Sequence, residues 1–402
     1  MTELLEISGT TAPGYESVRD AFASRVDELG DGGGAFAAYV GGSLVADLWA
    51  GTARPDVPWA EDTLAVLMSS TKGMTALVAQ MLEAKGRLDV EAPVSSYWPE
   101  FAANGKDAVT VRHVLTHTAG LVGLPGHAEF ITWDGDGWGS YDEIARRLES
   151  ATPAWEPGTA CGYHAITYGW LMGEIIFRIT GTRVGVLFKE WVAQPLGLDA
   201  HIGTPASEHD RIAWVIDEDY SKIPDDMRPL LETYMAMLRD PSTLAGQAFM
   251  GTETDSLLDK VEVFARSPNV WNIELPAGNG TSTARSLARM YAVLANGGEL
   301  EGLRLVPEES VRRWGSEQYR GWQQLAPVEM AQALGYHNNL AGMGATVGPF
   351  GPNELTFGHG GMGGQVGCCD ADNNVAIGFV RNHLSSVSPL SGELIAEVYA
   401  KL

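Results

Sequence analysis

Strand-like segments occur near both ends of this 402-residue sequence, and this distribution constrains the fold more than any other feature. Residues 34–40 and 43–49 are separated by Gly41-Gly42, a pair typical of a tight hairpin turn. Further strand-like runs near the other end are 355–359, 365–369 and 375–382. Because strands need partners, we expect the two ends of the chain to form one sheet.

The segments between these strands have mainly helical patterns. Residues 87–280 show few strand signals and contain long loops with glycine and tryptophan. The helices that we predict are 15–29, 165–179, 225–238, 283–296 and 391–401. The sequence therefore predicts an α+β protein, with a sheet domain from residues 1–86 and 281–402 and an inserted, mostly helical domain from residues 87–280.

Composition narrows the possible partners and location. The chain has 27 basic and 51 acidic residues, and its net charge of −24 disfavours nucleic acid and anionic membranes as partners. No apolar run approaches the roughly 18 residues of a membrane span, and the acidic N-terminus lacks the pattern of a signal peptide. The three cysteines form no disulfide framework. We therefore expect a cytoplasmic protein, with its oligomeric state left open.

A candidate nucleophile lies where the first strand-rich region meets a helix. Ser69 to Lys72 form an S-x-x-K tetrad. The apolar positions that follow it at helical spacing are Met74, Leu77, Val78, Met81 and Leu82. Residues three apart on a helix have Cβ atoms about 5–6 Å apart, so the lysine amine can reach the serine hydroxyl. Such a serine has a proton acceptor nearby and the positive end of a helix for developing negative charge.

Three other segments occur in a fixed order with this tetrad. They are residues 111–121, which contain L-T-H-T-A-G-L, residues 157–165, which contain Tyr163-His164-Ala165, and residues 357–364, which contain His359-Gly360-Gly361. This set resembles the serine β-lactamase-like superfamily, and most closely its class C β-lactamases and family VIII carboxylesterases. The resemblance extends from residue 34 to residue 382. It implies an α/β/α sandwich with an antiparallel sheet, an inserted helical domain, and no cofactor or metal.

The resemblance also implies roles for individual residues. Ser69 corresponds to the nucleophile, Lys72 to its neighbour one turn along the helix, and Tyr163 to the tyrosine that acts with the lysine as general base. The backbone N–H groups of Ser69 and Met362 correspond to the oxyanion hole. His359-Gly360-Gly361 occupies the place of the K-T-G box on the strand beside the site, where substrate binds.

Two positions depart from the β-lactamase pattern. Ala165 stands in place of an asparagine, so an amide that could bind a substrate or Lys72 is absent. His359 stands in place of a lysine, so a fixed cation for a β-lactam carboxylate is lost. Both changes weaken β-lactam recognition and leave the acyl-transfer groups intact. We expect ester hydrolysis first and, at most, weak β-lactam hydrolysis.

The identity of the general base stays open at this point. Lysine and tyrosine both have reference pKa values near 10, so neither is a good base at neutral pH without help from its surroundings. The lysine cation can favour a phenolate at Tyr163, or burial can lower the pKa of Lys72. Either arrangement provides one base for the Ser69 proton.

Other patterns in the sequence carry less weight. His113 and His117 are four residues apart, but the glutamate of a zinc-protease motif is missing, so we expect no metal there. We expect Cys161 to be a buried, unreactive thiol. Residues 370–374 lack the glycine of a calcium loop and are predicted to form a hairpin turn.

The sequence thus favours a serine carboxylesterase that cleaves short-chain or small alcohol esters through a Ser69 acyl-enzyme. An acyltransferase, or an amidase such as a D-aminopeptidase, is an alternative that uses the same groups. A catalytically silent binding protein is disfavoured because Ser69, Lys72 and Tyr163 are all present. We expect residues 125–139 and 217–255 to determine the ester preference.

Overall fold

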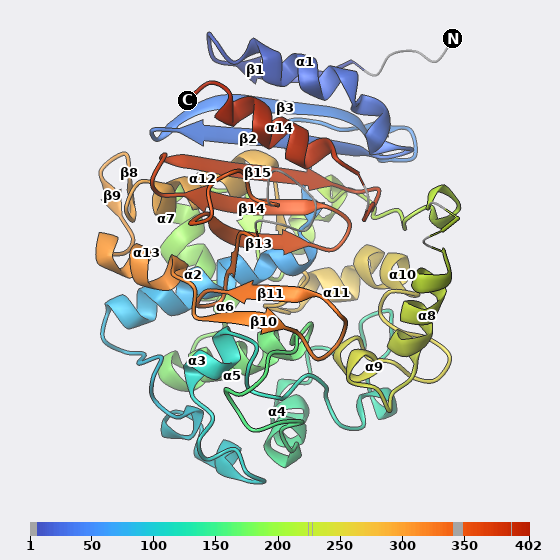
Figure 1. The fold of residues 1–402 in the computed structure, drawn as a ribbon, viewed down its shortest axis with the longest axis vertical. Helices are drawn as coiled ribbons and strands as arrows, with labels where there is room; N and C mark the ends of the chain where they lie inside the picture. Colours follow the sequence, from blue (N-terminus) through green and yellow to red (C-terminus); the bar gives the residue numbers. More distant parts are fainter. Residues whose placement is uncertain (1–5, 224, 227, 341–348, 387) are drawn as a thin grey trace.

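A computed structural model of the protein describes residues 6–223, 225–226, 228–340, 349–386 and 388–402 (Figure 1). Its main feature is a large antiparallel sheet. The strands along this sheet are, in order, β1 (Ser8–Thr11), β3 (Ser43–Arg54), β2 (Gly33–Val40), β15 (Val375–Arg381), β14 (Gln365–Asp370), β13 (Phe357–Gly361), β12 (His337–Asn338), β11 (Glu329–Gln332) and β10 (Tyr319–Trp322). The short strand β4 (Val57–Pro58) pairs with β3 outside this order.

The two ends of the chain meet in the middle of the sheet, as the sequence predicts. Strand β2 pairs with the whole length of β15, from Gly34 opposite Arg381 to Val40 opposite Val375. The β2–β3 hairpin turns at Gly41 and Gly42, whose φ angles are +55° and +77°. A two-residue hairpin of this kind needs positive φ at both positions, which glycine adopts without strain.

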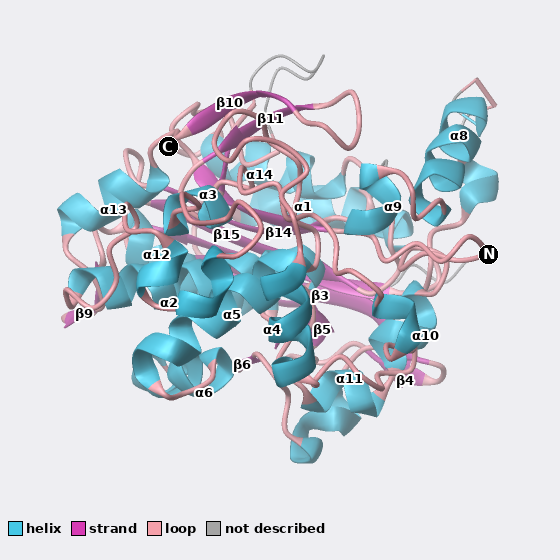
Figure 2. Cartoon of the chain, turned by 90° about the horizontal axis from the view of Figure 1, so that it is seen from below, coloured by secondary structure: helices cyan, strands magenta, loops and turns pink. Residues whose placement is uncertain are grey.

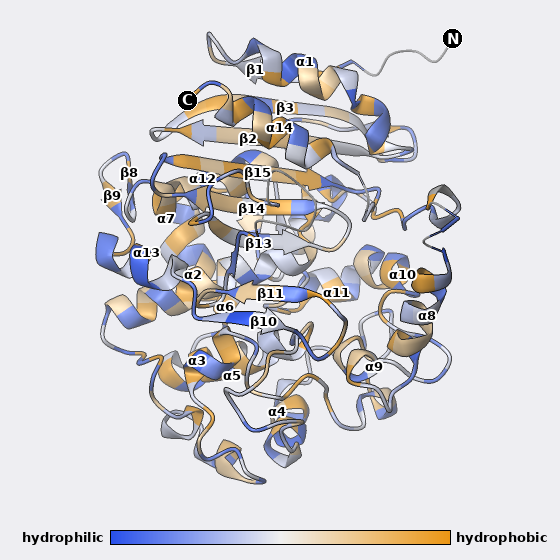
Figure 3. Cartoon of the chain, in the orientation of Figure 1, coloured by the Kyte–Doolittle hydropathy of each residue, from blue (hydrophilic) through white to orange (hydrophobic). Residues whose placement is uncertain are grey.

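Helices cover both faces of the sheet. On one face, α1 (Glu16–Ser24) and α14 (Leu390–Tyr399) bury Phe22 and Leu394 against Phe36 and Ile377 of the sheet. On the other face lie α12 (Ala284–Ala295) and, beyond it, α2 (Thr71–Ala84) (Figure 1). Strand β15, between these layers, is hydrophobic along most of its length (Figure 3). The arrangement is an α/β/α sandwich.

The rest of the described chain is mostly helical. Its helices are α3 (Val111–Leu115), α4 (Tyr141–Ser150), α5 (Thr167–Thr180), α6 (Val184–Phe188), α7 (Gln194–Leu196), α8 (Arg228–Arg239), α9 (Leu244–Ala248), α10 (Val261–Arg266), α11 (Pro268–Asn272) and α13 (Glu308–Gly315). Two small sheets lie outside the main one. The first consists of β5 (Ala65–Val66), β7 (Thr281–Ser282) and β6 (Ala200–His201), in this order. The second pairs β8 (Glu299–Leu300) with β9 (Leu303–Arg304). Of the described strands, β6 alone lies within residues 87–280. The division into two domains stays a prediction.

Some boundaries differ from those predicted. Strand β13 begins two residues later than expected, because Leu355 is 67% exposed and its N–H binds the Asn353 side chain in a turn. Strands β10, β11 and β12 were not predicted, because they are short and two of them lie at the outer end of the sheet.

Among the described residues, no helix combines the length and apolar character needed to cross a membrane.

Candidate active site

Ser69 lies in a tight turn, Met68–Ser70, that leads directly into α2. The side chain of Thr71 holds this turn, because its hydroxyl donates to the Met68 carbonyl at 2.7 Å and accepts from the Gly280 N–H at 2.9 Å. Met68 has a φ of +48°, which is unusual for a residue other than glycine. Such backbone strain occurs where surrounding contacts enforce it, often at functional sites. Ser69 itself is partly exposed.

The other side of this turn is fixed by β13. The Ser70 hydroxyl donates to the His359 carbonyl at 2.9 Å. A Cβ atom at Gly361 would lie 2.3 Å from the Leu67 carbonyl oxygen, so a glycine is needed for this close approach. The strand that carries His359-Gly360-Gly361 is therefore packed directly against the turn that carries Ser69.

Lys72 is completely buried and makes three polar contacts. Its Nζ lies 3.1 Å from the Ser69 Oγ, 2.8 Å from the Ala165 carbonyl oxygen and 2.9 Å from the Ala277 carbonyl oxygen. Within the described part of the chain, no carboxylate forms an ion pair with Lys72. Burial without a counter-charge lowers the pKa of Lys72 well below its ordinary value.

Tyr163 completes the group around Ser69. The Lys72 Nζ lies 4.8 Å from the centre of the Tyr163 ring, and the ring of His117 packs on the tyrosine at 4.8 Å. Burial raises the pKa of Tyr163, and a hydrogen bond with the Ser69 side chain opposes this rise only in part. The tyrosine therefore carries its proton at neutral pH.

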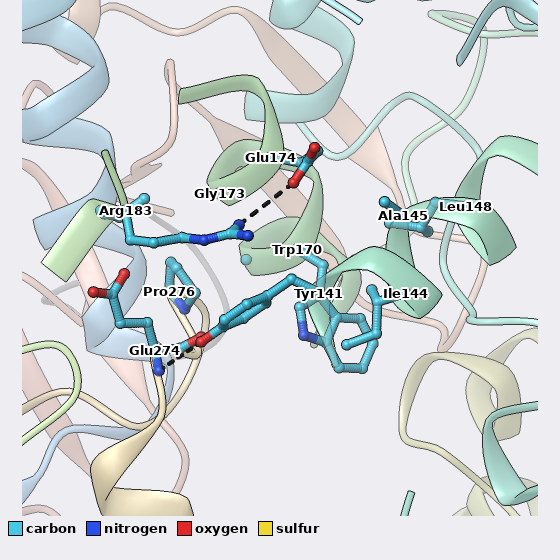
Figure 4. Close-up of a pocket in the computed structure, with 12 residues that line it drawn as sticks. Tyr141, Ile144, Ala145, Leu148, Trp170, Gly173, Glu174, Arg183, Glu274 and Pro276 are labelled. Carbon is cyan, nitrogen blue, oxygen red and sulfur yellow. Dashed lines mark hydrogen bonds and ion pairs between the residues drawn. The ribbon is translucent and has the colours of Figure 1, made fainter. Parts of the chain in front are cut away.

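The Ala277 carbonyl contacts Lys72, and the residues just before Ala277 are held by Tyr141 and Thr75. Figure 4 shows Tyr141 beside Glu274 and Pro276 of this segment. The Tyr141 hydroxyl accepts from the Glu274 N–H at 3.0 Å and donates to the Glu274 carbonyl at 3.1 Å. Thr75, one turn after Lys72 on α2, donates to the Pro276 carbonyl at 2.7 Å. The pocket in Figure 4 has a free volume of ≈ 20 Å³, enough for about one water molecule and too small for an ester substrate.

The predicted substrate-binding residues lie around the same point. His359 is buried, its Nδ1 donates to the Gly360 carbonyl at 2.6 Å, and its Nε2 has no partner. Ala165 contributes its carbonyl to Lys72, so the main chain supplies a contact to the lysine despite the missing asparagine. Met362 follows Gly361 directly, in the turn between β13 and β14. The structure thus brings every predicted site residue to one place.

Two histidines join the site without having been predicted there. Nitrogen atoms of His117, His337 and His359 all lie within 4.8 Å of one another. However, the His117 Nδ1 accepts the His164 N–H at 3.1 Å, so the His117 Nε2 carries the ring proton and offers no lone pair to a metal. The trio does not fit a three-histidine metal site, and metal-free catalysis stays a prediction. No sequence signal marks His337, which reaches the site through its pairing opposite Gly358.

The other residues considered in the sequence, His113, Cys161 and His164, make contacts typical of structural residues. The His113 Nδ1 accepts the Thr110 N–H in a reciprocal cap at the start of α3, away from the histidine trio. Cys161 is buried, and burial raises the pKa of its thiol to about 12, so it is protonated and unreactive at neutral pH. His164 accepts the Leu121 N–H at 3.1 Å and orders the loop around Tyr163.

Comparison with known proteins identifies the family to which this chain is similar. The profile of the family described as Beta-lactamase matches residues 18–400. The esterase/beta-lactamase LipL of Mycobacterium tuberculosis is 36% identical over 389 residues, which cover 96% of this chain and 84% of LipL. A solved penicillin-binding protein homolog from Caulobacter crescentus has a TM-score of 0.84 and 33% identity, covering 99% of this chain and 100% of its own. A solved family VIII carboxylesterase has a TM-score of 0.82 and 32% identity, with the same coverage.

The matches extend over nearly the whole chain, and they include proteins named as esterases and as β-lactamases. The fold, with its large antiparallel sheet between helices, is the one that these structures share. The chain therefore belongs to the beta-lactamase family and is a serine hydrolase of the serine β-lactamase-like superfamily.

Proposed function

We propose that the protein is a carboxylesterase that cleaves short-chain or small alcohol esters through an acyl-enzyme on Ser69. The observation that carries this proposal is the contact between the buried Lys72 amine and the Ser69 hydroxyl. The names of LipL and of the family VIII carboxylesterase support an esterase reaction within this superfamily.

The contacts of Lys72 suit a neutral amine that acts as the base. A neutral amine has two N–H donors and one lone pair, whereas an ammonium group has three donors and no acceptor. The carbonyls of Ala165 and Ala277 take two N–H donors, which leaves the lone pair for the Ser69 hydroxyl proton. Because burial lowers the pKa of Lys72 well below its ordinary value, the neutral form is reached at a lower pH than for an exposed lysine.

Tyr163 then serves as the proton donor. Its raised pKa makes it a poor base but leaves a phenol that can protonate the departing alcohol. Ser69 Oγ attacks the ester carbonyl, the backbone N–H groups of Ser69 and Met362 stabilise the oxyanion, and the alcohol leaves with a proton. Water, deprotonated by the same Lys72–Tyr163 pair, hydrolyses the acyl-enzyme and restores Ser69.

The site favours simple esters over β-lactams. Burial lowers the pKa of His359 well below its usual value, with further lowering from His337 and Lys72, so His359 is neutral at pH 7. A neutral imidazole provides no fixed cation for the carboxylate of a β-lactam. Ala165 provides no side-chain amide for an acylamino group.

The decisive experiment compares wild type with Ser69→Ala on p-nitrophenyl acetate, butyrate and a chromogenic cephalosporin. We expect ester turnover that is lost in the variant, with little cephalosporin cleavage by either protein. A fluorophosphonate probe should label wild type at Ser69 and leave the variant unlabelled. Ester turnover that survives in Ser69→Ala would refute the mechanism, and cephalosporin turnover equal to ester turnover would refute the substrate class.

A further inference from the structure

The loop formed by residues 273–280, between α11 and β7, supplies one of the two carbonyls that bind Lys72. The Ala277 carbonyl accepts from the Lys72 Nζ at 2.9 Å. At the end of the same loop, the Gly280 carbonyl accepts the Leu67 N–H at 2.8 Å, in the segment that leads to the proposed nucleophile. The position of this loop therefore decides whether Lys72 keeps its second carbonyl.

One buried side chain, that of Asn279, holds the loop in shape. Its Nδ2 donates to the Val270 carbonyl at 2.6 Å and to the Ile273 carbonyl at 2.7 Å, and its Oδ1 accepts the Leu275 N–H at 3.0 Å. The two carbonyls lie at the C-terminal end of α11, where backbone oxygens have no partner within the helix. Asn279 is 1% exposed, so water does not compete for these groups. The amide therefore ties the end of α11 to the turn that precedes Ala277.

Helix α5 and Tyr141 support the same loop. Helices α2 and α5 lie side by side (Figure 2). A Cβ atom at Gly169 of α5 would lie 2.5 Å from the Ala277 nitrogen, so the two main chains are in direct contact. The Tyr141 hydroxyl adds its two hydrogen bonds to the main chain of Glu274. Since Ala277 has no polar side chain of its own, the direction of its carbonyl depends on these contacts and on Asn279.

We propose that Asn279 is a positioning residue for the reaction: it fixes the loop so that the Ala277 carbonyl stays within hydrogen-bonding distance of the Lys72 amine. The hydrogen bonds of the Asn279 side chain all end on main-chain atoms, so it acts through the loop and not on the substrate. This inference rests on the proposed function, in which Lys72 is the base. It adds a residue that lies outside all four sequence motifs of the site.

The Ala277 carbonyl stabilises the two protonation states of Lys72 unequally. A hydrogen bond from an ammonium group to a carbonyl is stronger than one from a neutral amine. Loss of this acceptor should therefore lower the pKa of Lys72 further than burial alone does. It should also free the amine to turn, so that its lone pair no longer points steadily at the Ser69 hydroxyl.

The other titratable groups around Lys72 should not obscure this effect. Burial raises the pKa of Tyr163 and of Tyr168, whose rings face the Lys72 amine, so both stay protonated. Burial also lowers the pKa of the histidines of the site, so they are neutral at pH 7; they are His117, His164, His337 and His359. The acidic limb of a pH profile for Ser69 reactivity therefore reports the protonation of Lys72.

The test measures the rate at which a fluorophosphonate probe labels Ser69 across the pH range, per folded molecule, together with hydrolysis of p-nitrophenyl acetate. In Asn279→Ala we expect the acidic limb of the labelling rate to move to lower pH by about 0.5 pH unit or more. The plateau rate should fall about tenfold or more, because the base is no longer aligned. Tyr141→Phe keeps the ring and removes only the hydroxyl contacts to Glu274, so it tests the same loop if Asn279→Ala does not fold. It should show smaller changes in the same direction.

Asn382→Ala is the matched control. Asn382 is also buried, its Nδ2 donates to the carbonyls of Thr52 and Ala53 at 3.1 and 3.0 Å, and its Oδ1 accepts the Gly33 N–H at 2.7 Å. These hydrogen bonds end on β2 and β3, and none of them reaches the 273–280 loop. The control loses the same three kinds of hydrogen bond, so we expect a comparable loss of stability and an unchanged pH profile.

The possible results separate the inference from the function on which it rests. If the probe labels wild type but no ester is hydrolysed, the ester assignment fails and the labelling profiles still test Asn279. If wild type is not labelled, both fail. If Asn279→Ala keeps the wild-type profile, or Asn382→Ala shifts it equally, Asn279 has only a structural role and the inference is overturned. A shift of the limb to higher pH also overturns it, because the loop would then act by excluding water and not through the Ala277 carbonyl.

Discussion

Among the residues whose burial the structure describes, Lys72 and Lys106 are the two fully buried lysines, and their surroundings differ in one respect. Lys106 donates to three carbonyls, those of Ala103, Glu149 and Ala151, at the end of α4. Lys72 contacts two carbonyls and one hydroxyl, that of Ser69. Three carbonyls need three donors, which only the ammonium form supplies, whereas two carbonyls and a hydroxyl also accommodate the neutral amine.

The electrostatic surroundings reinforce this difference. Burial lowers the pKa of both lysines, but the Glu149 carboxylate opposes the effect at Lys106 and no counter-charge opposes it at Lys72. Lys106 sits at the C-terminal end of α4, where the helix dipole favours a cation, whereas Lys72 lies in the first turn of α2, where it disfavours one. Burial alone does not make a lysine a base; the number and kind of its acceptors decide.

The largest expected difference between the two lysines is in catalysis. Lys72→Met removes the proposed base, so ester turnover per folded molecule should fall about 10³-fold or more. The loss of the donor to two carbonyls should lower the thermal unfolding midpoint by less than the loss of the donor to three carbonyls at Lys106. Hydrolysis of p-nitrophenyl butyrate and a thermal melt measure the two effects. A variant that retains a tenth of wild-type turnover would show that Lys72 is not the base.

At Lys106 we expect the opposite result, a loss of stability without a loss of turnover. Lys106→Met leaves three carbonyls without their donor and should lower the free energy of unfolding by about 2–4 kcal/mol. Because Lys106 does not contact the Ser69 group, kcat per folded molecule should not change. Urea unfolding and active-site titration provide the two numbers. Lost turnover at unchanged stability would contradict the structural role.

A smaller effect should appear in the pH dependence of stability. Between the lowered pKa of folded Lys72 and the unfolded value near 10.4, the unfolded chain binds one more proton than the folded chain. The stability of wild type relative to Lys72→Met should therefore rise with pH in this window, by up to about 1.4 kcal/mol per pH unit. Paired unfolding experiments across this window test the sign. The stability of wild type relative to Lys106→Met should depend less on pH, because the Glu149 carboxylate partly offsets the lowering of the Lys106 pKa by burial.

The smallest expected effect concerns the counter-charge of Lys106. In wild type the Trp98 Nε1–H donates to the Glu149 Oε1 at 2.7 Å. Glu149→Gln keeps an acceptor for this N–H but removes the negative charge. We expect a loss of less than about 1 kcal/mol and no change in kcat. Glu149 also lies 3.9 Å from Arg178, so Glu100→Gln, which removes a more exposed partner of the same arginine, is the matched control. Equal losses in both variants would assign the effect to Arg178.

Local patterns in the sequence predicted the parts of the fold and site that depend on neighbouring residues. Gly41-Gly42 predicted the central hairpin, and the S-x-x-K spacing predicted the contact between Ser69 and Lys72 one helical turn apart. Tyr163 is far from both in the sequence, and the family resemblance, with its fixed motif order, was needed to place it.

The remaining parts of the site depend on contacts that the pattern of side chains in the sequence does not reveal. The carbonyls of Ala165 and Ala277 bind Lys72 through main-chain atoms, which every residue has. His337 reaches the site through the pairing of a two-residue strand, too short for a periodic signal. The proposal that Lys72 is the base depends on its burial and on its hydrogen-bond acceptors, and both follow from the tertiary structure.

The pairing of β2 with β15 has a consequence for how the protein is made. During synthesis the β2–β3 hairpin leaves the ribosome long before Val375–Arg381, so its inner edge has no partner until these residues have also been synthesised. Contacts this distant in sequence form slowly and leave the nascent chain open to misassembly. The Ser69 turn also needs His359 and Gly361 of β13 to lock it. The site of the proposed nucleophile is therefore assembled only after β13 has been synthesised, so we expect chains that end before β13 to carry Ser69 without its reactivity.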